Sequence, residues 1–310
     1  MKHIVTGGAG FIGSALVKKL AAQGHEVVVV DDHSSSGGEL LNENSLKSSV
    51  KTVCGNISHI KTQTGLHEKL LDAFEGVDTV FHLAAKARVQ PSIKEPVHFN
   101  ATNVEGTLNI LEYSRKAKVR RFVFTSSSSI YGNTEIIPTL EDTPPNPLSP
   151  YGLQKLIGEQ YCQLYSRIHN MDTVCLRYFN VYGENAPTSG AYCLVIGKFI
   201  QQAREGKNLT IYGKGDQKRD FTYLGDVVNA NILASNYTGK FSGEAFNIGN
   251  GENRTVQQIA DAFKIPCEYL SERLEPKETL ACNEKAKKVL GWKPTGDVLK
   301  WLECYLPTVL

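Results

Sequence analysis

The sequence predicts a doubly wound α/β protein, in which helices cover both faces of a mainly parallel β-sheet, with a smaller lobe at the C-terminal end. Apolar runs of strand length alternate with segments of helical periodicity over nearly 180 residues, which is typical of this fold class. A glycine-rich segment at 7–13 directly follows the first apolar run. Positions 27–30 are all valine, as expected for a strand that is buried on both faces of a parallel sheet.

The first strand, turn and helix form a dinucleotide-binding pattern. A short strand at 4–5 runs into the glycine segment, a helix follows and ends before Gly24, and the second strand, 26–30, is followed by Asp31. The glycines let the backbone approach a pyrophosphate, the helix N-terminus offers free N–H groups, and Asp31 can accept hydrogen bonds from a ribose. Because a carboxylate would repel a 2′-phosphate, the pattern favours NAD over NADP. A tight turn that binds no ligand is the alternative.

Three further strands are expected at 50–54, 79–85 and 121–125, with helices at 66–74 and 96–118 and an exposed polar loop at 34–49 near the adenosine end. In an open parallel sheet, ligands lie beyond the carboxyl ends of the strands. Small residues at 83–85 suggest that a flat group passes close to the backbone there. The four serines at 126–129 offer hydroxyl groups to a ligand, although an ordinary serine-rich loop is the alternative. Asn103 either turns inward or is an exposed polar residue.

The helix expected at 150–169 carries a tyrosine and a lysine one turn apart. Pro150 suits the first turn of a helix. Tyr151 and Lys155 are then at positions i and i+4, where their side chains can meet. A nearby positive charge lowers the pKa of a tyrosine, which would let Tyr151 act as a base near neutral pH. Taken alone, the pair favours an ordinary amphipathic helix that exposes both side chains, because Tyr-x-x-x-Lys often occurs by accident.

The elements become shorter after the strand at 173–179. We expect a helix at 195–206, a strand at 209–212, a charged loop at 214–221, and helices near 226–235, 255–263 and 283–290 that complete a smaller lobe. Residues 1–179 are predicted to form an NAD-binding Rossmann domain and residues 180–310 a substrate-binding lobe. This boundary is predicted to be discontinuous, because segments near 221–228 and 245–250 are expected to return to the first domain. Arg219 either holds a phosphate through its forked donors or is a solvated surface residue.

Composition and charge argue against several classes of function. The 310 residues carry a formal net charge of +2, which gives no reason to expect a nucleic acid or a membrane surface as partner. The seven cysteines are scattered and never form a Cys-x-x-Cys pair, so we expect reduced thiols and no metal site. No signal peptide is recognisable, and no apolar run approaches the ~20 residues of a membrane helix. We therefore expect a cytoplasmic protein.

Taken together, these motifs resemble the extended short-chain dehydrogenase/reductase family. The resemblance rests on the glycine segment with Asp31, the strand end at 125–128, Tyr151 with Lys155, and two further segments, and it covers almost the whole chain. The two further segments are 177–183 and 219–221. Within the family, the sequence is most similar to the nucleotide-sugar 4-epimerases, especially those that act on UDP-N-acetylglucosamine and UDP-glucose. The resemblance implies tightly held NAD, a UDP-sugar bound by the smaller lobe, and a homodimer.

The resemblance also implies roles for individual residues. Tyr151 is expected to be the catalytic base, Lys155 to bind the nicotinamide ribose and lower the pKa of Tyr151, and Ser127 to hydrogen-bond the sugar 4-hydroxyl. The implied reaction is a reversible oxidation at C4, in which a 4-keto sugar turns over in the site and hydride returns to its opposite face. The residues implied in NAD binding are Gly7, Gly10, Phe11, Ile12, Gly13, Asp31, Asp32, Asn56, Ile57, Leu83, Ala84, Ala85, Asn103, Tyr151, Lys155 and Tyr178. Those implied in substrate binding are Ser127, Ser128, Tyr151, Val195 and Thr279, with Asn180 and Arg219 at the diphosphate and Thr210 and Tyr212 near the uracil.

Differences among members of the family suggest which reaction and which sugar to expect. The related 4,6-dehydratases carry Asp-Glu where this sequence has Ser128 and Ser129, so water elimination lacks its acid. Branches that act on glucuronate usually place a basic residue where this sequence has Glu184, whose charge would repel a carboxylate. The segments 189–192 and 195–196 resemble the N-acetylhexosamine epimerases. Thr279 is small, so an acetamido group is expected to fit beside it.

Three positions depart from the pattern of the family. Asn56 replaces a common aspartate beside the adenine, Cys282 replaces a common aspartate in the last third, and Glu184 is unusual for its place, which could mean an unfamiliar sugar.

Two other functions remain open. The first is a net nucleotide-sugar dehydrogenase or reductase, and the second is a non-catalytic NAD-binding sensor or scaffold in which the tyrosine, lysine and serine would be idle.

Overall fold

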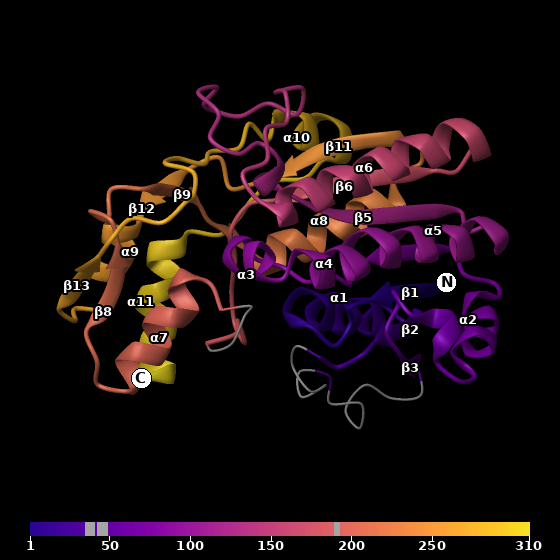
Figure 1. Cartoon of the computed structure of the whole chain (residues 1–310), viewed down its shortest axis with the longest axis horizontal. Coiled ribbons are helices and arrows are strands. Elements are labelled where there is room, and N and C mark those ends of the chain that lie inside the picture. Colours follow the sequence, from indigo (N-terminus) through magenta and orange to yellow (C-terminus); the bar gives the residue numbers. More distant parts are fainter. Residues whose placement is uncertain (35–40, 42–48, 189–192) are drawn as a thin grey trace.

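Parallel strands form the central sheet of the protein. The computed structural model describes residues 1–34, 41, 49–188 and 193–310, and within these residues the sheet has seven strands in the order β11-β6-β5-β4-β1-β2-β3 (Figure 1). The strands are β1 (Lys2–Thr6), β2 (Glu26–Asp31), β3 (Val50–Cys54), β4 (Thr79–His82), β5 (Arg121–Ser127), β6 (Thr173–Tyr178) and β11 (Ser242–Ile248). The direction of strand addition reverses between β1 and β4, where open α/β sheets bind their ligands. The predicted doubly wound parallel sheet is confirmed.

Helices cover both faces of this sheet. They are α1 (Phe11–Ala22), α2 (Leu66–Phe74), α3 (Val89–Lys94), α4 (Pro96–Asn100), α5 (Thr107–Lys116), α6 (Pro150–His169), α8 (Leu224–Asn236) and α10 (Glu284–Leu290), with short 3-10 turns at Ile60–Thr62 and Ser128–Ile130. α1 and α8 pack together on one face, over a buried apolar cluster that includes Leu16 and Val227. α2, α5 and α6 cover the other face, over a second cluster that includes Leu70 and Phe122. Burial on both sides explains why β2 is a continuous run of valines.

Two helices that were predicted for the smaller lobe belong to the sheet. α8 packs against α1, β5 and β6, and α10 packs against β11 and α8. β11 pairs in parallel with β6, with Phe246 opposite Leu176, so the chain returns to the sheet after it has entered the lobe. The expectation that helices near 226–235 and 283–290 complete the lobe is therefore wrong. The boundary between 179 and 180 stays a prediction.

The helix predicted at 96–118 contains a wider turn in its middle. α4 is followed by a π-helical segment, Ala101–Gly106, and then by α5. Single π-helical turns inside α-helices often occur at functional sites. Here the wide turn includes Asn103, which points inward and is only 2% exposed. α6 spans the range that the sequence predicts for it, 150–169.

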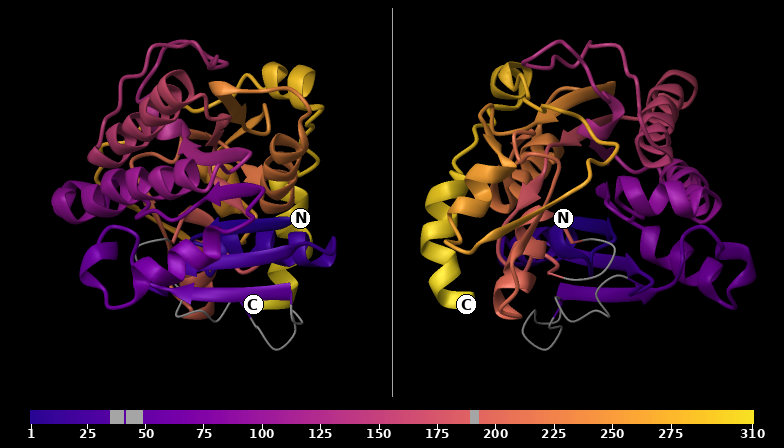
Figure 2. Two further views of the ribbon diagram at one scale, coloured as in Figure 1. Left: turned by 90° about the vertical axis from the view of Figure 1, so that its right-hand side faces the viewer. Right: turned by 60° about the vertical axis from the view of Figure 1, so that its left-hand side comes forward.

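A smaller lobe lies beside the carboxyl edge of the sheet (Figure 2). Its elements are β7 (Val181–Tyr182), α7 (Val195–Arg204), β8 (Leu209–Tyr212), β9 (Lys218–Asp220), β10 (Thr222–Tyr223), β12 (Asn253–Thr255), α9 (Val256–Asp261), β13 (Cys267–Leu270) and α11 (Val298–Val309). α7, α9 and α11 share a separate buried apolar cluster that includes Phe199 and Leu302. The predicted charged loop at 214–221 contains β9, which pairs with β12. β12, β13 and α11 were not predicted, and the two strands are short and polar.

Candidate active site

The carboxyl edge of the sheet and the smaller lobe line a cavity of about 460 Å³. Its walls come from the ends of β1, β2, β4 and β5, the start of α6, and residues 273–279. The cavity therefore lies where the strand order predicts a ligand site. The predicted residues that line it are Gly7, Gly10, Phe11, Ile12, Gly13, Asp31, Asp32, Asn56, Ile57, Leu83, Ala84, Ala85, Ser127, Ser128, Tyr151, Lys155, Tyr178, Asn180, Arg219 and Thr279.

The glycine segment between β1 and α1 forms a cradle for a ligand, and its backbone is open to the cavity at one glycine, Gly10. Gly7 has a positive φ of 69°, and a Cβ atom there would lie 2.6 Å from the backbone nitrogen of Ala84. A Cβ atom at Gly13 would lie 2.1 Å from the Gly7 carbonyl oxygen, so this glycine lets α1 pack close to the turn. At Gly10 the nearest atom would be 3.3 Å away, and the residue lines the cavity. A pyrophosphate can therefore approach the backbone at Gly10, beside the free N–H groups at the start of α1. This cradle fits a dinucleotide cofactor.

Two aspartates lie at the end of β2. The Asp31 carboxylate accepts hydrogen bonds from the backbone N–H groups of Ala9 at 2.9 Å and His33 at 2.8 Å, which tie β2 to the glycine segment. The amide of Asn56 donates to Asp32 Oδ2 at 3.0 Å. An aspartate in place of Asn56 would bring two carboxylates together. The departure from the family pattern at this position therefore has a local cause.

The start of α6 is held close to the serine segment that follows β5. The Ser149 hydroxyl caps the helix by accepting a hydrogen bond from the Gly152 N–H at 3.2 Å, and Pro150 occupies the first turn. A Cβ atom on Gly152 would lie 2.5 Å from the Ser129 carbonyl oxygen. These contacts place Tyr151 against the strand end, in the wall of the cavity.

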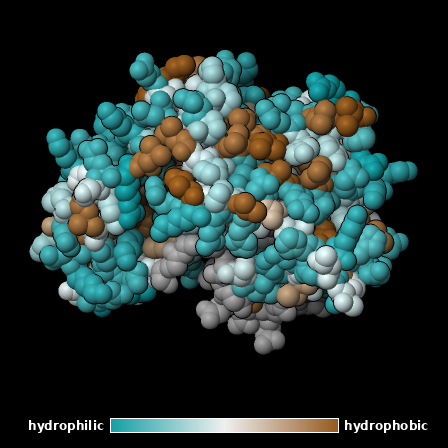
Figure 3. Space-filling view, viewed as in Figure 1, coloured by the Kyte–Doolittle hydropathy of each residue, from teal (hydrophilic) through white to brown (hydrophobic). Residues whose placement is uncertain are grey.

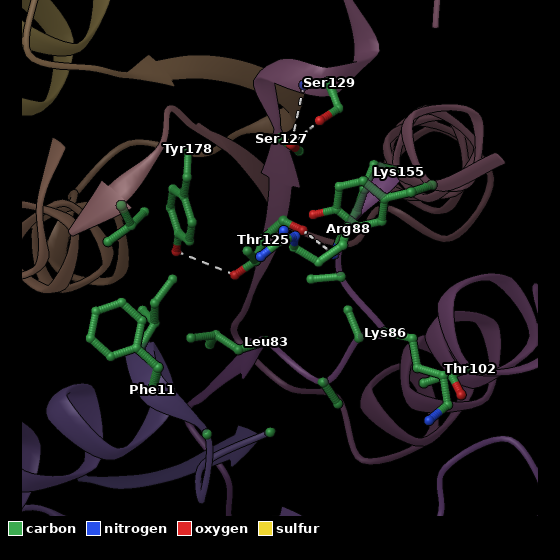
Figure 4. A pocket seen from close by; sticks show the side chains of 18 of the residues that line it. Phe11, Leu83, Lys86, Arg88, Thr102, Thr125, Ser127, Ser129, Lys155 and Tyr178 are labelled. Atoms are coloured by element: carbon green, nitrogen blue, oxygen red, sulfur yellow. Dashed lines mark hydrogen bonds between the residues drawn. The ribbon is translucent and has the colours of Figure 1, made fainter. Parts of the chain in front are cut away.

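Ser127, Tyr151 and Lys155 all line this wall, and Figure 4 shows Ser127 and Lys155. The Lys155 ammonium donates a hydrogen bond to the Thr125 carbonyl oxygen at 2.7 Å, and it lies 5.9 Å from the centre of the Tyr151 ring. The Ser127 and Ser129 hydroxyl groups are 3.1 Å apart. The structure thus brings together the three residues that the resemblance assigned to catalysis.

Burial governs the pKa values of Tyr151 and Lys155. It raises the pKa of Tyr151, and a hydrogen bond with Ser127 opposes this increase to a smaller extent. Burial also lowers the pKa of Lys155 to about 7, against the opposing charge of Glu159. The expectation that Lys155 brings down the pKa of Tyr151 is therefore wrong for the protein alone, because a buried lysine with this pKa is itself only partly charged near neutral pH.

Asn103 does not line the cavity, although the resemblance implied that it binds NAD. Its side-chain oxygen accepts a hydrogen bond from the Lys86 N–H at 2.8 Å, and its amide donates to the Lys86 carbonyl at 2.9 Å and to the Gln154 side chain at 2.9 Å. The π-helical turn aims this side chain at the segment that follows β4. Asn103 therefore positions that segment, which does line the cavity.

Tyr178, Asn180 and Thr279 form another part of the wall. The Tyr178 hydroxyl accepts a hydrogen bond from Thr125 Oγ1 at 3.2 Å. The Asn180 amide donates to the Asp220 carbonyl at 2.9 Å and to Thr279 Oγ1 at 3.3 Å. Asn180 and Thr279 come from segments that are 99 residues apart, and their contact fixes the floor of the lobe against the end of β6.

Two arginines of the lobe contribute positive charge. The Arg219 guanidinium forms an ion pair with Glu275 at 2.9 Å. The Arg273 guanidinium lies over the Tyr212 ring, 3.1 Å from its centre, and itself lines the cavity. Tyr212, which was predicted to lie near the uracil, is not among the lining residues, because Arg273 covers its ring.

Thr210 and Val195 also fall outside the cavity lining. The Gln202 side chain engages Thr210, since it donates to the Thr210 hydroxyl at 2.6 Å and accepts from the Thr210 N–H at 3.1 Å. Val195 is the first residue of α7, and its neighbour Leu194 lines the cavity in its place. The role of Val195 in substrate binding stays a prediction.

Sequence reasoning missed two segments of the wall. Residues 86–90 directly follow the predicted strand end at 83–85, so their position in the chain was a usable signal. Residues 273–276 arrive from a polar stretch without periodicity, and no sequence signal points to them. The remaining lining residues that were not predicted are Val30, Ser34, Gly55, Thr102, Thr125, Val181, Pro187 and Leu194, whereas Ser126 and Ser129 belong to the predicted serine segment.

Glu184 is also placed differently from the sequence-based expectation. Its carboxylate accepts hydrogen bonds from the Trp301 indole at 2.7 Å and the Tyr223 hydroxyl at 3.1 Å, and it does not line the cavity. The argument that Glu184 would repel a carboxylate on the sugar is therefore wrong. The likeness to N-acetylhexosamine epimerases rested on 189–192 and on Val195 and Ile196. The first segment lies outside the described residues, and the second begins α7.

Comparisons with known proteins agree with this geometry. Residues 3–249 match the model of the NAD dependent epimerase/dehydratase family. A UDP-glucose 4-epimerase of Mycolicibacterium smegmatis is 36% identical over 302 residues, which cover 95% of this chain and 94% of that protein.

Solved structures are similar over almost the full chain. A UDP-N-acetylglucosamine 4-epimerase of Methanobrevibacter ruminantium in complex with UDP-N-acetylmuramic acid has a TM-score of 0.89 and 30% identity, and the match covers 99% of this chain and 97% of that one. A UDP-glucuronic acid 4-epimerase of Bacillus cereus in complex with UDP-glucuronic acid and NAD has a TM-score of 0.87 and 32% identity, with full coverage of both chains. The family match, the identities and the glycine cradle lead to one conclusion: this chain belongs to the NAD dependent epimerase/dehydratase family and uses NAD.

Proposed function

We propose that this chain interconverts the C4 epimers of UDP-sugars through a 4-keto intermediate, with UDP-N-acetylglucosamine and UDP-glucose, and their C4 epimers, as substrates. The observation that carries the proposal is the meeting of Ser127, Tyr151 and Lys155 in the cavity that also contains the open glycine cradle. The relatives are UDP-sugar 4-epimerases, but they are named for three different sugars. Their names therefore support the reaction more strongly than the choice of sugar.

Each of the three residues has a role that its surroundings support. When bound, NAD would supply the hydride chemistry and, in its oxidised form, a positive charge on the nicotinamide. Tyr151, as phenolate, takes the proton from the 4-hydroxyl, and Ser127 donates a hydrogen bond to the 4-oxygen. A positive charge beside a buried phenol favours the phenolate, which counteracts the increase in the pKa of Tyr151 that burial causes. Lys155, fixed by the Thr125 carbonyl, binds and orients the cofactor ribose.

The polar residues near Tyr151 favour epimerisation over water elimination. Ser128 and Ser129 supply hydroxyl groups beside Ser127, at the places where elimination would need an acid and a second base. Among the described residues of the wall, the nearest carboxylate in the lobe, Glu275, is already paired with Arg219. The small side chain of Thr279 lines the cavity, and this supports space for an acetamido group.

Proton NMR of the purified protein with each UDP-sugar separately tests the proposal, because inversion at C4 changes the ring proton couplings. UDP-glucose, UDP-N-acetylglucosamine and UDP-glucuronate are the three sugars to compare. We expect C4 inversion without net consumption of NAD, and a decrease in turnover of about 10²- to 10⁴-fold in Tyr151→Phe, since a general base contributes about that much. Tyr161→Phe, on the same helix but outside the cavity lining, is the matched control. Normal turnover in Tyr151→Phe would contradict the assigned base, and stoichiometric NADH would indicate a net dehydrogenase.

We further propose that the protein is a cytoplasmic homodimer. All seven cysteines are free thiols. Ile93, Val97 and Leu153 expose apolar side chains on α3, α4 and α6, with Val97 82% exposed, and Figure 3 shows apolar surface over these helices. Burial of this patch between two copies would remove it from water. In the described part of the chain, no helix combines the length and the apolar character needed to cross a bilayer. Light scattering of the wild type and of Val97→Asp tests the dimer, and a monomeric wild type would contradict it.

A further inference from the structure

Arg88 has the most unusual backbone in the cavity wall. Its φ is 104°, whereas the other non-glycine residues with positive φ in the described part of the chain lie between 24° and 61°. Side chains with a Cβ atom rarely adopt such a conformation, which is typical of glycine. Residues that keep a disfavoured backbone cluster at ligand sites, where the surrounding structure holds them in place. The backbone of Arg88 therefore suggests that its side chain has a function in the cavity.

Within the part of the chain that the structure describes, the Arg88 guanidinium has no anionic partner. Its Nη1 atom is buried and has no hydrogen-bond partner, and among the described residues no carboxylate forms an ion pair with it. Burial lowers the pKa of Arg88, and the positive charge of Arg273 acts in the same direction. Glu275 opposes this shift from a distance, but its carboxylate is paired with Arg219 at 2.9 Å. Arg88 is half-buried, and a buried guanidinium nitrogen without a partner is costly, so an anionic group of a ligand would stabilise it.

Arg88 comes from a different element than the lobe arginines that suit the diphosphate, although it lies near enough to Arg273 for their charges to interact. Arg88 follows β4 and precedes α3, and its side chain reaches into the part of the cavity that Figure 4 shows around Thr125 and Lys155. Arg219 and Arg273 come from the lobe instead and provide positive charge there. A UDP-sugar with its diphosphate at the lobe arginines would direct its sugar towards Tyr151, on the same side as Arg88.

We propose that Arg88 is a specificity-determining residue that pairs with a carboxylate on the sugar, so that the chain accepts UDP-hexuronates and other UDP-sugars with an acidic substituent. The proposal rests on the proposed UDP-sugar 4-epimerase function and adds an acidic sugar to the neutral ones. Glu184, the carboxylate that the sequence placed in the way of such a sugar, is held by Trp301 and Tyr223 outside the cavity lining. Planar, forked donors such as those of arginine suit a carboxylate.

Calorimetric titration of the NAD-loaded protein with UDP, UDP-glucose and UDP-glucuronate tests this role. The variants are Arg88→Gln, which removes the charge, and Arg88→Gly, which removes the charge and suits the positive φ, so that it keeps the backbone even if the glutamine variant folds poorly. The control is Lys94→Gln, which removes one positive charge from the exposed end of the same helix, α3. The measured quantity is the ratio of the affinities for UDP-glucuronate and UDP-glucose.

We expect both Arg88 variants to lower this ratio by about 10- to 100-fold, the loss typical of a charge-assisted hydrogen-bonded pair. Lys94→Gln should keep the ratio of the wild type. An unchanged ratio in Arg88→Gly would overturn the proposal. A parallel loss of affinity for all three ligands, UDP included, would also overturn it and assign Arg88 to the diphosphate. C4 inversion is followed separately by NMR and tests the underlying epimerase function. Its absence with every sugar would reject that function. The affinity ratio would still test whether Arg88 binds a carboxylate on the sugar.

Discussion

Lys155 places an ammonium group where the surrounding protein disfavours its charge. The residue is 3% exposed, and burial lowers its pKa from the ordinary value of 10.5 to about 7. A lysine with a lower pKa in the folded than in the unfolded protein destabilises the fold wherever the unfolded chain binds the extra proton. This linkage costs the wild type about 4 kcal/mol at about pH 7.5. The cost is largest below pH 7 and shrinks as the pH rises towards 10.5.

Lys155→Met should therefore stabilise the protein while it abolishes turnover. Methionine is similar in length and carries no charge, so the linkage cost disappears. The lost hydrogen bond to the Thr125 carbonyl offsets part of this gain, by about 1–3 kcal/mol. The expected net increase in the free energy of unfolding is about 1–3 kcal/mol at about pH 7.5. Such a gain is typical when a functional group is removed from a site that is not optimal for stability.

Urea unfolding at two pH values measures this effect. The wild type and Lys155→Met are compared at about pH 7.5 and about pH 9.5 after removal of NAD, which ultraviolet absorbance verifies. We expect the advantage of the variant to fall by about 2.5 kcal/mol at the higher pH, because the folded protein then needs no proton on Lys155 and the unfolded lysine, with an ordinary pKa of 10.5, binds its proton less strongly as the pH approaches that value. Lys18→Met, an exposed position on α1, should show no such pH dependence. A variant that is less stable at about pH 7.5, or an advantage that is the same at both pH values, would refute the reasoning.

Two further predictions follow from the cradle and from the lobe. Gly10→Ala should fold with nearly the stability of the wild type, because its Cβ atom meets only the Gly7 carbonyl in the protein. The variant should bind NAD at least ~10-fold more weakly, because the same Cβ atom fills the space for the pyrophosphate. Gly13→Ala should lower the free energy of unfolding by about 1–3 kcal/mol, because its Cβ atom would lie 2.1 Å from that same carbonyl. Thermal unfolding and NAD titration distinguish the two, and equal losses of stability would contradict this assignment. Glu184→Gln should keep the ratio of the affinities for UDP-glucuronate and UDP-glucose, since the Glu184 carboxylate accepts a hydrogen bond from Trp301. A large increase in that ratio on titration would contradict this placement and indicate that Glu184 acts on the bound sugar.

The parts of the site that could be predicted from the sequence are those that short segments determine by themselves. The glycine cradle needs only a strand, a turn and a helix that are consecutive in the chain, and Asp31 follows on the next strand. α6 was predicted over its full length with Pro150 as the signal at its start, and the structure shows further local signals at its ends, with Ser149 as the N-cap and Asn170 in the left-handed conformation at the C-cap. Such signals act within a few residues, so no tertiary contact is needed to interpret them.

The wrong predictions arose where partners from distant parts of the chain decide the outcome. Glu184 is turned away from the cavity by Trp301, which is 117 residues later in the sequence. Most residues of α8 are buried, but its sequence does not show that α1, and not the lobe, covers them. Similarly, Arg273 covers Tyr212 from a stretch without any periodic pattern. In each case the local pattern was interpreted correctly, and the missing information was the identity of the partner.

The same distinction explains why the reaction can be inferred more readily than the sugar. The groups proposed for the chemistry, Ser127, Tyr151 and Lys155, lie on one strand end and on the first turns of the helix that packs on it, so two neighbouring elements suffice to place them. The groups that would recognise the sugar come from β4, β6 and the lobe, and several are fixed by contacts across about 100 residues, as between Asn180 and Thr279 at 99 residues. A single substitution in these segments can alter the fit of a substituent without disturbing Tyr151. Arg88 is such a position, because its segment is held by Asn103 from the neighbouring helix while its guanidinium is left without an anionic partner for a ligand to supply.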